Sequence, residues 1–145
     1  MDDYQKHMVY FKIVGNFNVD KLLHLLDGVP IDDTIQKGAP RQINPASKYD
    51  FSSIRVGRTY FSQEEFITTE SALTQLFGKQ DALNEIRKTF DVAFWLQIVP
   101  YVYDCFPVIE FGQKVIDFCS YTKTEISIDG YYLGPVEERK DEYRG

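Results

Sequence analysis

The spacing of apolar residues along this chain predicts seven elements, in the order strand, helix, strand, helix, strand, helix, strand. β-branched and aromatic residues dominate residues 8–14, which end at Gly15 and are typical of a strand. Residues 19–26 instead carry Val19 and three leucines at helical spacing, after Asn18, which is a good helix-capping residue. The chain therefore opens with a strand and a short amphipathic helix.

Alternating residues across 51–61 predict a second strand, and a long helix follows it. Ser62 and Glu65 match a capping box, and apolar residues recur at helical spacing across 63–90. We expect this helix to begin within the first eight of those residues. Gly78 lies inside it at a cost of about 1 kcal/mol relative to alanine. A break near Gly78 is therefore an alternative, although the apolar stripe keeps its phase across the glycine.

The second half of the chain contains the strongest strand pattern. Residues 91–103 are apolar on both faces, which predicts a central strand under a layer of helices. Pro100 marks a bulge or the end of pairing in this strand, because proline cannot donate a backbone hydrogen bond. A third helix is expected around residues 112–121, and a last strand over residues 125–132.

This order of elements predicts an α+β fold, namely a two-layer sandwich. We expect a mixed or antiparallel sheet of about four strands, covered by about three helices mainly on one face. A ferredoxin-like arrangement is the nearest simple relative, although the pattern does not fix the order of the strands. Residues 1–135 form one domain in this interpretation, and residues 136–145 form a charged C-terminal tail without apolar anchors.

Composition supports one soluble domain. The chain has 145 residues, of which 43% are hydrophobic and 15% aromatic, enough for a substantial core. Its densest apolar run, residues 92–96, is far shorter than the roughly 20 residues that a membrane span needs. Asp2 and Asp3 stand where a secretion signal would carry basic residues, so we expect a cytoplasmic protein. Cys105 and Cys119 lie among apolar residues, and we expect them to be buried and reduced.

The sequence contains none of the usual enzyme signatures. His7 and His24 are too few and too isolated for a common metal site, and neither cysteine has a partner at ligand spacing. Gly78 and Lys79 resemble the end of a phosphate-binding loop, but Gln80 replaces the required hydroxyl residue and the upstream glycine is missing. We therefore predict no catalytic residues, no metal and no cofactor, and we lean against an enzyme.

Basic residues gather in one window of an otherwise acidic chain. The formal net charge is −6, yet the window 34–61 has a net charge of about +4. It contains one acid, Asp50, and five basic residues, which are Lys37, Arg41, Lys48, Arg55 and Arg58. The window overlaps residues 27–50, which show neither helical nor strand spacing. Connections of this length are usually functional or disordered.

Two interpretations of these charges remain open. Lys37, Arg41 and Arg55 could converge on a phosphate, a carboxylate or an acidic partner. Alternatively, the glycine and prolines of this segment shape a turn, and the charges are solvated or paired, which we favour. Alternation along the second strand places Arg55 and Arg58 on opposite faces unless a bulge or twist intervenes. The candidate ligand-binding residues are therefore Lys37, Arg41 and Arg55.

Several short segments also stand in a recognisable order along the chain. They are residues 10–15, 18–20, 37–41, 51–53 and 126–129. Together with the long helix between them, these segments resemble a bacterial family catalogued as domain of unknown function 4279, over residues 8–132. The resemblance implies a small bacterial cytosolic α+β domain, and it supplies no catalytic residue.

The sequence favours a non-enzymatic protein-interaction domain with an unknown protein partner. An immunity-like neutraliser of a toxin is one form of this hypothesis, because small acidic domains can mask basic enzymes by charge complementarity. The alternative is a small-molecule anion-binding protein, or an enzyme, that uses the basic window 34–61. Nucleic-acid binding is disfavoured, because it requires a broad basic face and this chain is acidic overall.

Overall fold

A computed structural model describes residues 4–135, and the predicted tail, residues 136–145, lies outside the described residues. Along the described chain the elements are β1 (His7–Asn16), α1 (Val19–Leu23), η1 (His24–Leu26), β2 (Asp33–Ile35), β3 (Ser52–Phe61), β4 (Ile67–Thr68), η2 (Thr69–Leu73), α2 (Gln80–Thr89), β5 (Asp91–Val99), β6 (Tyr101–Val102), β7 (Ile109–Glu110), α3 (Gln113–Thr122), β8 (Glu125–Ile128) and β9 (Tyr131–Tyr132), where η marks a 3₁₀ helix.

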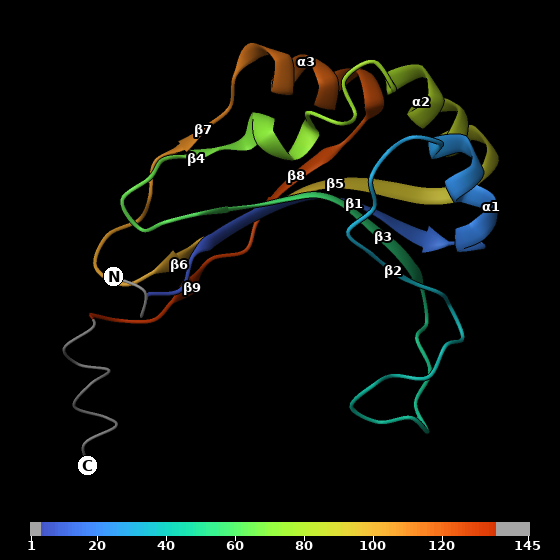
Figure 1. The fold of residues 1–145 in the computed structure, drawn as a ribbon, viewed down its shortest axis with the longest axis horizontal. Coiled ribbons are helices and arrows are strands. Elements are labelled where there is room, and N and C mark those ends of the chain that lie inside the picture. The colour runs from blue at the N-terminus through green and yellow to red at the C-terminus, as the bar shows by residue number, and fades with distance from the viewer. Residues whose placement is uncertain (1–3, 136–145) are drawn as a thin grey trace.

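Five strands form one mixed sheet in the order β2-β3-β1-β5-β8. β1 is antiparallel to both of its neighbours, whereas β8 runs parallel to β5. The helices of the described chain lie on one face of this sheet, and the opposite face is free of helices (Figure 1). This arrangement confirms the α+β class and the one-sided helical layer, with five strands where about four were expected. The ferredoxin-like arrangement is not confirmed.

The core lies between the sheet and the helices. Alternate residues of the three central strands are buried against this layer, because successive side chains of a strand point to opposite faces. They are Val9, Phe11 and Ile13 of β1, Ile54 and Val56 of β3, and Phe94, Leu96 and Ile98 of β5. Phe118 of α3 packs edge-on against Phe11, with 6.0 Å between the ring centroids. Full burial of such a side chain stabilises the fold by about 1.5–3 kcal/mol.

The predicted long helix is broken at Gly78, so the single helix over 63–90 is wrong and the alternative break is correct. The segment instead forms β4, η2 and then α2, which begins at Gln80. Gly78 has a φ of 93°, a left-handed conformation that ends the preceding turns, and its N–H donates to Gln80 Oε1 at 2.6 Å. The apolar stripe keeps its phase because η2 and α2 bury their apolar residues in the same core.

Two predicted strands are shorter than expected, and three short strands, β2, β4 and β7, were missed. Pro100 ends β5 as expected, and β6 follows it. The last strand splits into β8 and β9, separated by Asp129 and Gly130. β2 lies inside the predicted connection 27–50 and pairs with β3. Three residues are too few for a periodic signal, so the sequence pattern could not show β2.

Both cysteines are free, but only one of them is buried. Cys119 of α3 is buried, and burial raises the pKa of its thiol to about 11. Cys105 is exposed, contrary to expectation, because it follows β6 in a loop rather than lying in a strand. Within residues 4–135, no helix is long and apolar enough to cross a membrane.

Candidate functional site

One row of side chains crosses all five strands on the face of the sheet that has no helices. Each Cα of the row is the direct partner of the next in the strand register. The row contains Asp33 of β2, Arg55 of β3, Lys12 of β1, Trp95 of β5 and Glu125 of β8. Tyr10 and Gln97 face each other on the same side in the adjacent row. We call these seven residues the uncovered sheet face.

Two cations lie side by side at the centre of the uncovered sheet face. Arg55 has its Nε 3.8 Å from Asp33 Oδ1, and its guanidinium carbon lies 4.8 Å from the centre of the Tyr10 ring. Lys12 is half-buried and has no ion pair within the described chain, and its Nζ lies 5.9 Å from the centre of the Phe51 ring. Burial, and then the charge of Arg55, lower the pKa of Lys12. Like charges on directly opposed residues destabilise a sheet.

A β-bulge brings a third cation to the same carboxylate. The register of β1 against β3 shifts between Val9 and Phe11, where Gly57 adopts a φ of 72°. Arg58 then forms an ion pair and a hydrogen bond with Asp33, the same carboxylate that faces Arg55. Burial opposes the charge of Arg58, but the hydrogen bond and charge of Asp33 raise its pKa. The expected separation of Arg55 and Arg58 on opposite faces is thus overridden by the bulge.

Several polar atoms near these cations have no hydrogen-bond partner among residues 4–135. They are Ser53 Oγ, Arg55 Nε and Arg58 Nε, and all three atoms are buried. Ser53 stands two positions before Arg55 on β3, so it shares its side of the sheet. Buried polar groups are normally hydrogen-bonded. This part of the sheet therefore holds unused donors beside a local excess of positive charge.

The other two predicted ligand-binding residues lie elsewhere. Lys37 and Arg41 belong to the connection between β2 and β3, which extends away from the sheet (Figure 1). The Lys37 side chain is exposed, and the Arg41 guanidinium carbon lies 4.8 Å from the centre of the Tyr49 ring. Within the described residues, no hydrogen bond, ion pair or ring contact joins either residue to Arg55. A ligand role for Lys37 and Arg41 stays a prediction.

Sequence reasoning missed Lys12, Tyr10 and Trp95 as site residues. A usable signal was present for Lys12, because it is the one charged residue within the apolar segment 8–14. A charge in the middle of an apolar central strand must lie on the side away from the core. No comparable signal marked the two aromatic residues, since rings are equally common in sheet cores.

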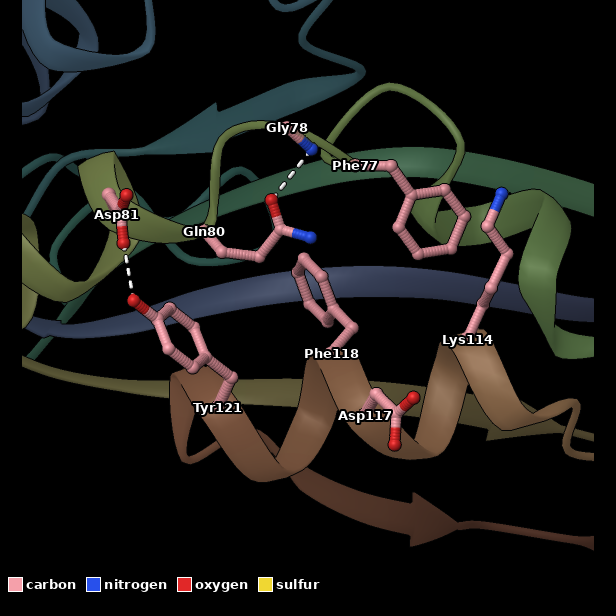
Figure 2. A pocket seen from close by; sticks show the side chains of 8 residues that line it. All are labelled: Phe77, Gly78, Gln80, Asp81, Lys114, Asp117, Phe118 and Tyr121. Carbon is pink, nitrogen blue, oxygen red and sulfur yellow. Dashed lines mark hydrogen bonds between the residues drawn. The ribbon is translucent and has the colours of Figure 1, made fainter.

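A groove in the helical layer is the second candidate site. It lies between the start of α2 and one face of α3, and has a volume of about 600 Å³ (Figure 2). The groove is lined by Phe77, Gly78, Gln80, Asp81, Lys114, Asp117, Phe118 and Tyr121. α3 contributes four of these residues at positions that recur every three or four residues and so share one face of the helix. We call this the α2–α3 groove.

Aromatic rings and charged groups alternate along the α2–α3 groove. Phe77 and Phe118 pack edge-on with 5.9 Å between ring centroids, and Lys114 Nζ lies 5.0 Å from the centre of the Phe77 ring. At the other end the Tyr121 hydroxyl donates to Asp81 Oδ1 at 2.5 Å (Figure 2). This hydrogen bond and the charge of Asp81 raise the pKa of Tyr121.

The two histidines lie outside both candidate sites. His7 is fully buried in β1, and its Nδ1 accepts a hydrogen bond from the Tyr101 N–H at 3.0 Å. His24 lines a hollow beside α1 together with Asp20 and Asp27. In the part of the chain that the structure describes, no three histidine, cysteine, aspartate or glutamate side chains are grouped to hold a metal ion.

Comparison with known proteins adds a family assignment. No curated protein and no solved structure matches the chain. Residues 5–133 match the family described as a domain of unknown function, DUF4279. This match includes both candidate sites and nearly all of the described residues. The resemblance found in the order of the sequence segments is therefore confirmed, and the chain belongs to the DUF4279 family.

Proposed function

We propose that this chain is a non-enzymatic protein-interaction domain that binds its partner on the uncovered sheet face. The observation that carries this proposal is the adjacent pair Lys12 and Arg55. Arg55 pairs with Asp33, whereas Lys12 has no carboxylate partner within the described residues. The surrounding side chains support the proposal, since tryptophan, tyrosine and arginine are the residue types enriched at the centres of interfaces. Trp95 and Tyr10 flank the pair.

The partner would offer a carboxylate to this pair. An aspartate or glutamate between Lys12 and Arg55 would replace their repulsion with two charge-assisted hydrogen bonds. Arg55 suits the same chemistry, because the terminal N–H groups of a guanidinium can donate to a carboxylate while its Nε stays beside Asp33. The centre of the uncovered sheet face is positively charged, whereas the whole chain has a net charge of −6. This pattern favours a partner that is acidic at the centre of its contact surface and basic around it.

An immunity-like role is the form of this function that we favour. In that role the domain holds a toxin-like enzyme inactive, and the acidic outer surface attracts a basic enzyme before the central carboxylate docks. Complementary charge patterns of this kind raise association rates and select the partner more than they raise affinity. The binding rate would then fall with added salt, since salt screens exposed charges over about 10 Å at 0.1 M.

Affinity capture followed by reconstitution tests the proposal. The wild-type chain and a Lys12→Glu variant would be used as baits, with Lys48→Glu as a control that makes the same charge change at an exposed residue outside the sheet. A partner identified with the wild type would be purified and titrated by calorimetry. We expect Lys12→Glu to weaken binding at least tenfold, or about 1.4 kcal/mol, and Lys48→Glu to retain it.

Two results would count against the proposal. One is a purified partner that binds Lys12→Glu and the wild type equally. The other is a partner whose binding leaves the fluorescence of Trp95, the one tryptophan of the chain, unchanged, because a protein covering the uncovered sheet face must exclude water from that ring.

A second candidate function is the binding of a small carboxylate or phosphate compound at the same cations. The unpartnered Ser53 Oγ and Arg58 Nε favour it, because a small anion reaches between side chains where a protein surface does not. A thermal-shift screen with carboxylates and phosphates tests this function, since a bound ligand raises the melting temperature. We expect Lys12→Met to abolish any such rise, and a flat screen would remove this candidate.

A further inference from the structure

We infer that the α2–α3 groove is a second binding site, separate from the uncovered sheet face, and that it takes the arginine side chain of a peptide segment. The groove belongs to the helical layer, whereas the uncovered sheet face lies on the opposite side of the sheet (Figure 1). The inference therefore does not depend on the function proposed above. Its basis is the chemistry of the groove lining.

Unpaired carboxylates supply the charge complementarity. Asp81 and Asp117 both line the groove, and neither forms an ion pair with any of residues 4–135. Asp81 accepts the Tyr121 hydroxyl through Oδ1, which leaves Oδ2 for another donor. Among the described residues, Asp117 accepts a hydrogen bond only from Gln113, one turn earlier on α3. A guanidinium suits such a site, because it presents five N–H donors in a fixed planar fork.

The aromatic lining provides the second part of the recognition. Tyr121 is 56% exposed, so one end of the groove offers an accessible ring beside the Asp81 carboxylate. Phe118 is buried and lies next to Tyr121 along α3, between that residue and Phe77 (Figure 2). Guanidinium groups stack on aromatic faces, where the ring quadrupole attracts the cation. An arginine side chain thus finds a carboxylate and an aromatic ring side by side at the Asp81 and Tyr121 end of the groove.

The chain already shows this type of contact at the other end of the groove. Lys114 places its ammonium over the Phe77 ring instead of pairing with Asp117, three residues further along α3. The Lys114 ammonium therefore covers the Phe77 ring and leaves the face of the Tyr121 ring available to another cation. Lys114 must also repel an incoming guanidinium, so its removal should strengthen binding. An increase in affinity after the removal of Lys114 therefore distinguishes a cation-binding site from an anion-binding site.

The groove has room for an arginine side chain together with part of the peptide that carries it. Small-molecule pockets generally measure about 300–1,000 Å³, and the groove of about 600 Å³ is open along the helix surface. We therefore expect an arginine within an extended or helical peptide to enter the groove from the side of α3.

Titration of the full chain with N-acetyl-arginine amide, followed by ¹H–¹⁵N NMR, tests the inference. N-acetyl-citrulline amide is the matched control, because it keeps the shape of arginine and removes the charge. We expect arginine amide to shift the resonances of groove residues such as Gly78, Asp81 and Tyr121, with a dissociation constant in the millimolar range. Citrulline amide should shift them at least about threefold less at equal concentration.

Variants of the groove give opposite expected effects. Asp117→Asn should weaken the binding of arginine amide about three- to tenfold, and Lys114→Gln should strengthen it about two- to threefold. Tyr121→Phe should keep the ring contact while releasing Asp81 from its internal hydrogen bond. Glu64→Gln, at an exposed acid outside the groove, is the control for net charge and should change nothing.

Three outcomes would overturn the inference. They are equal shifts with arginine and citrulline amides, weaker binding after Lys114→Gln, and shifts that spread over acidic residues outside the groove and respond equally to Glu64→Gln. Asp117 is exposed on α3, so Asp117→Asn is expected to fold, and its own NMR spectrum reports whether it does.

Discussion

At the scale of single residues, His7 is the clearest source of pH dependence. Its side chain is fully buried, its Nδ1 accepts from the Tyr101 N–H, and its Nε2 has no partner within the described residues. Burial lowers its pKa in the folded protein below the ordinary value of 6.5. As the pH falls, His7 therefore takes up a proton in the unfolded chain before it does so in the folded protein. Its contribution to the free energy of unfolding is complete above about pH 6.5 and is lost below it.

We predict that the free energy of unfolding decreases as the pH falls below about 6.5, by at most about 1.4 kcal/mol per pH unit from this residue. His7→Asn should flatten this part of the curve, because an amide oxygen can accept the Tyr101 N–H without titrating. Urea unfolding between about pH 8 and pH 5 measures the slope. The exposed His24→Asn serves as control, and an unchanged slope in His7→Asn would contradict the prediction.

Gly57 is the residue on which the bulge depends. It has a φ of 72°, and a Cβ at this position would lie 2.1 Å from the backbone oxygen of Ala72. Gly28 has a similar φ of 83°, but nothing lies within 4 Å of the equivalent Cβ. The two glycines therefore separate the conformational cost from the steric cost.

We predict that Gly28→Ala destabilises the protein by about 1 kcal/mol and Gly57→Ala by more than about 2 kcal/mol. Chemical unfolding of both variants checks the difference. Gly57→Ala should also weaken partner or anion binding, because the bulge places Arg58 at Asp33. Equal losses in the two variants would show that the contact with η2 is relieved by a small backbone movement.

Residue patterns predicted only part of the site. Arg55 was identified from the basic window, and it lies at the centre of the uncovered sheet face. Lys37 and Arg41 belong to the same window in the sequence, but the chain carries them into a projecting connection. Lys12 and Asp33 are far from Arg55 in sequence and reach it only through strand pairing. Local charge density cannot reveal such long-range neighbours.

At the scale of elements, the register of β1 against β3 creates a conflict between stability and binding. It places Lys12 directly opposite Arg55 with no carboxylate on β1 to separate them. Like charges at directly opposed positions cost about 0.2–1 kcal/mol. Sites of this kind are retained for function at the expense of stability.

Lys12→Met should therefore raise the free energy of unfolding by about 0.5–1 kcal/mol while abolishing binding on the uncovered sheet face. Methionine keeps an unbranched side chain at this position and removes the charge, together with the ammonium contact to the Phe51 ring. Urea unfolding measures the gain, and Lys48→Met, at an exposed position, should stay within about 0.5 kcal/mol of the wild type. A destabilised Lys12→Met protein would mean that the ammonium contributes to the fold, and would remove the basis of the proposed site.

The elements themselves were predictable where apolar residues recur over seven or more positions. β1, β3, β5 and α3 are close to their expected ranges for this reason. The length of the long helix was overestimated because η2 and α2 bury one continuous apolar stripe. The spacing of apolar residues does not show the left-handed turn at Gly78 that separates the two helices. β2 and the bulge were missed because both arise from pairing between segments rather than from spacing within one.

At the scale of the whole molecule, the two candidate sites differ in sign as well as in place. The uncovered sheet face carries Lys12, Arg55 and nearby Arg58 around Asp33, whereas the α2–α3 groove carries two unpaired carboxylates against Lys114. The sheet and its core separate them (Figure 1). A partner interface of ordinary size covers roughly 800 Å² on each protein, so a compact partner is expected to contact one side of the sheet at a time.

We therefore predict that the two sites bind independently. Lys12→Met should leave the affinity for arginine amide unchanged within about 0.5 kcal/mol, and Asp117→Asn should leave binding on the uncovered sheet face equally unchanged, because the sites share no residue. NMR titration reports the groove, and the fluorescence of Trp95 reports the sheet. A coupling above about 1 kcal/mol in the double variant would show that binding on one side rearranges the core between them. The shared core rings Phe11 and Phe118, which link β1 to α3, would then be the residues to test for that coupling.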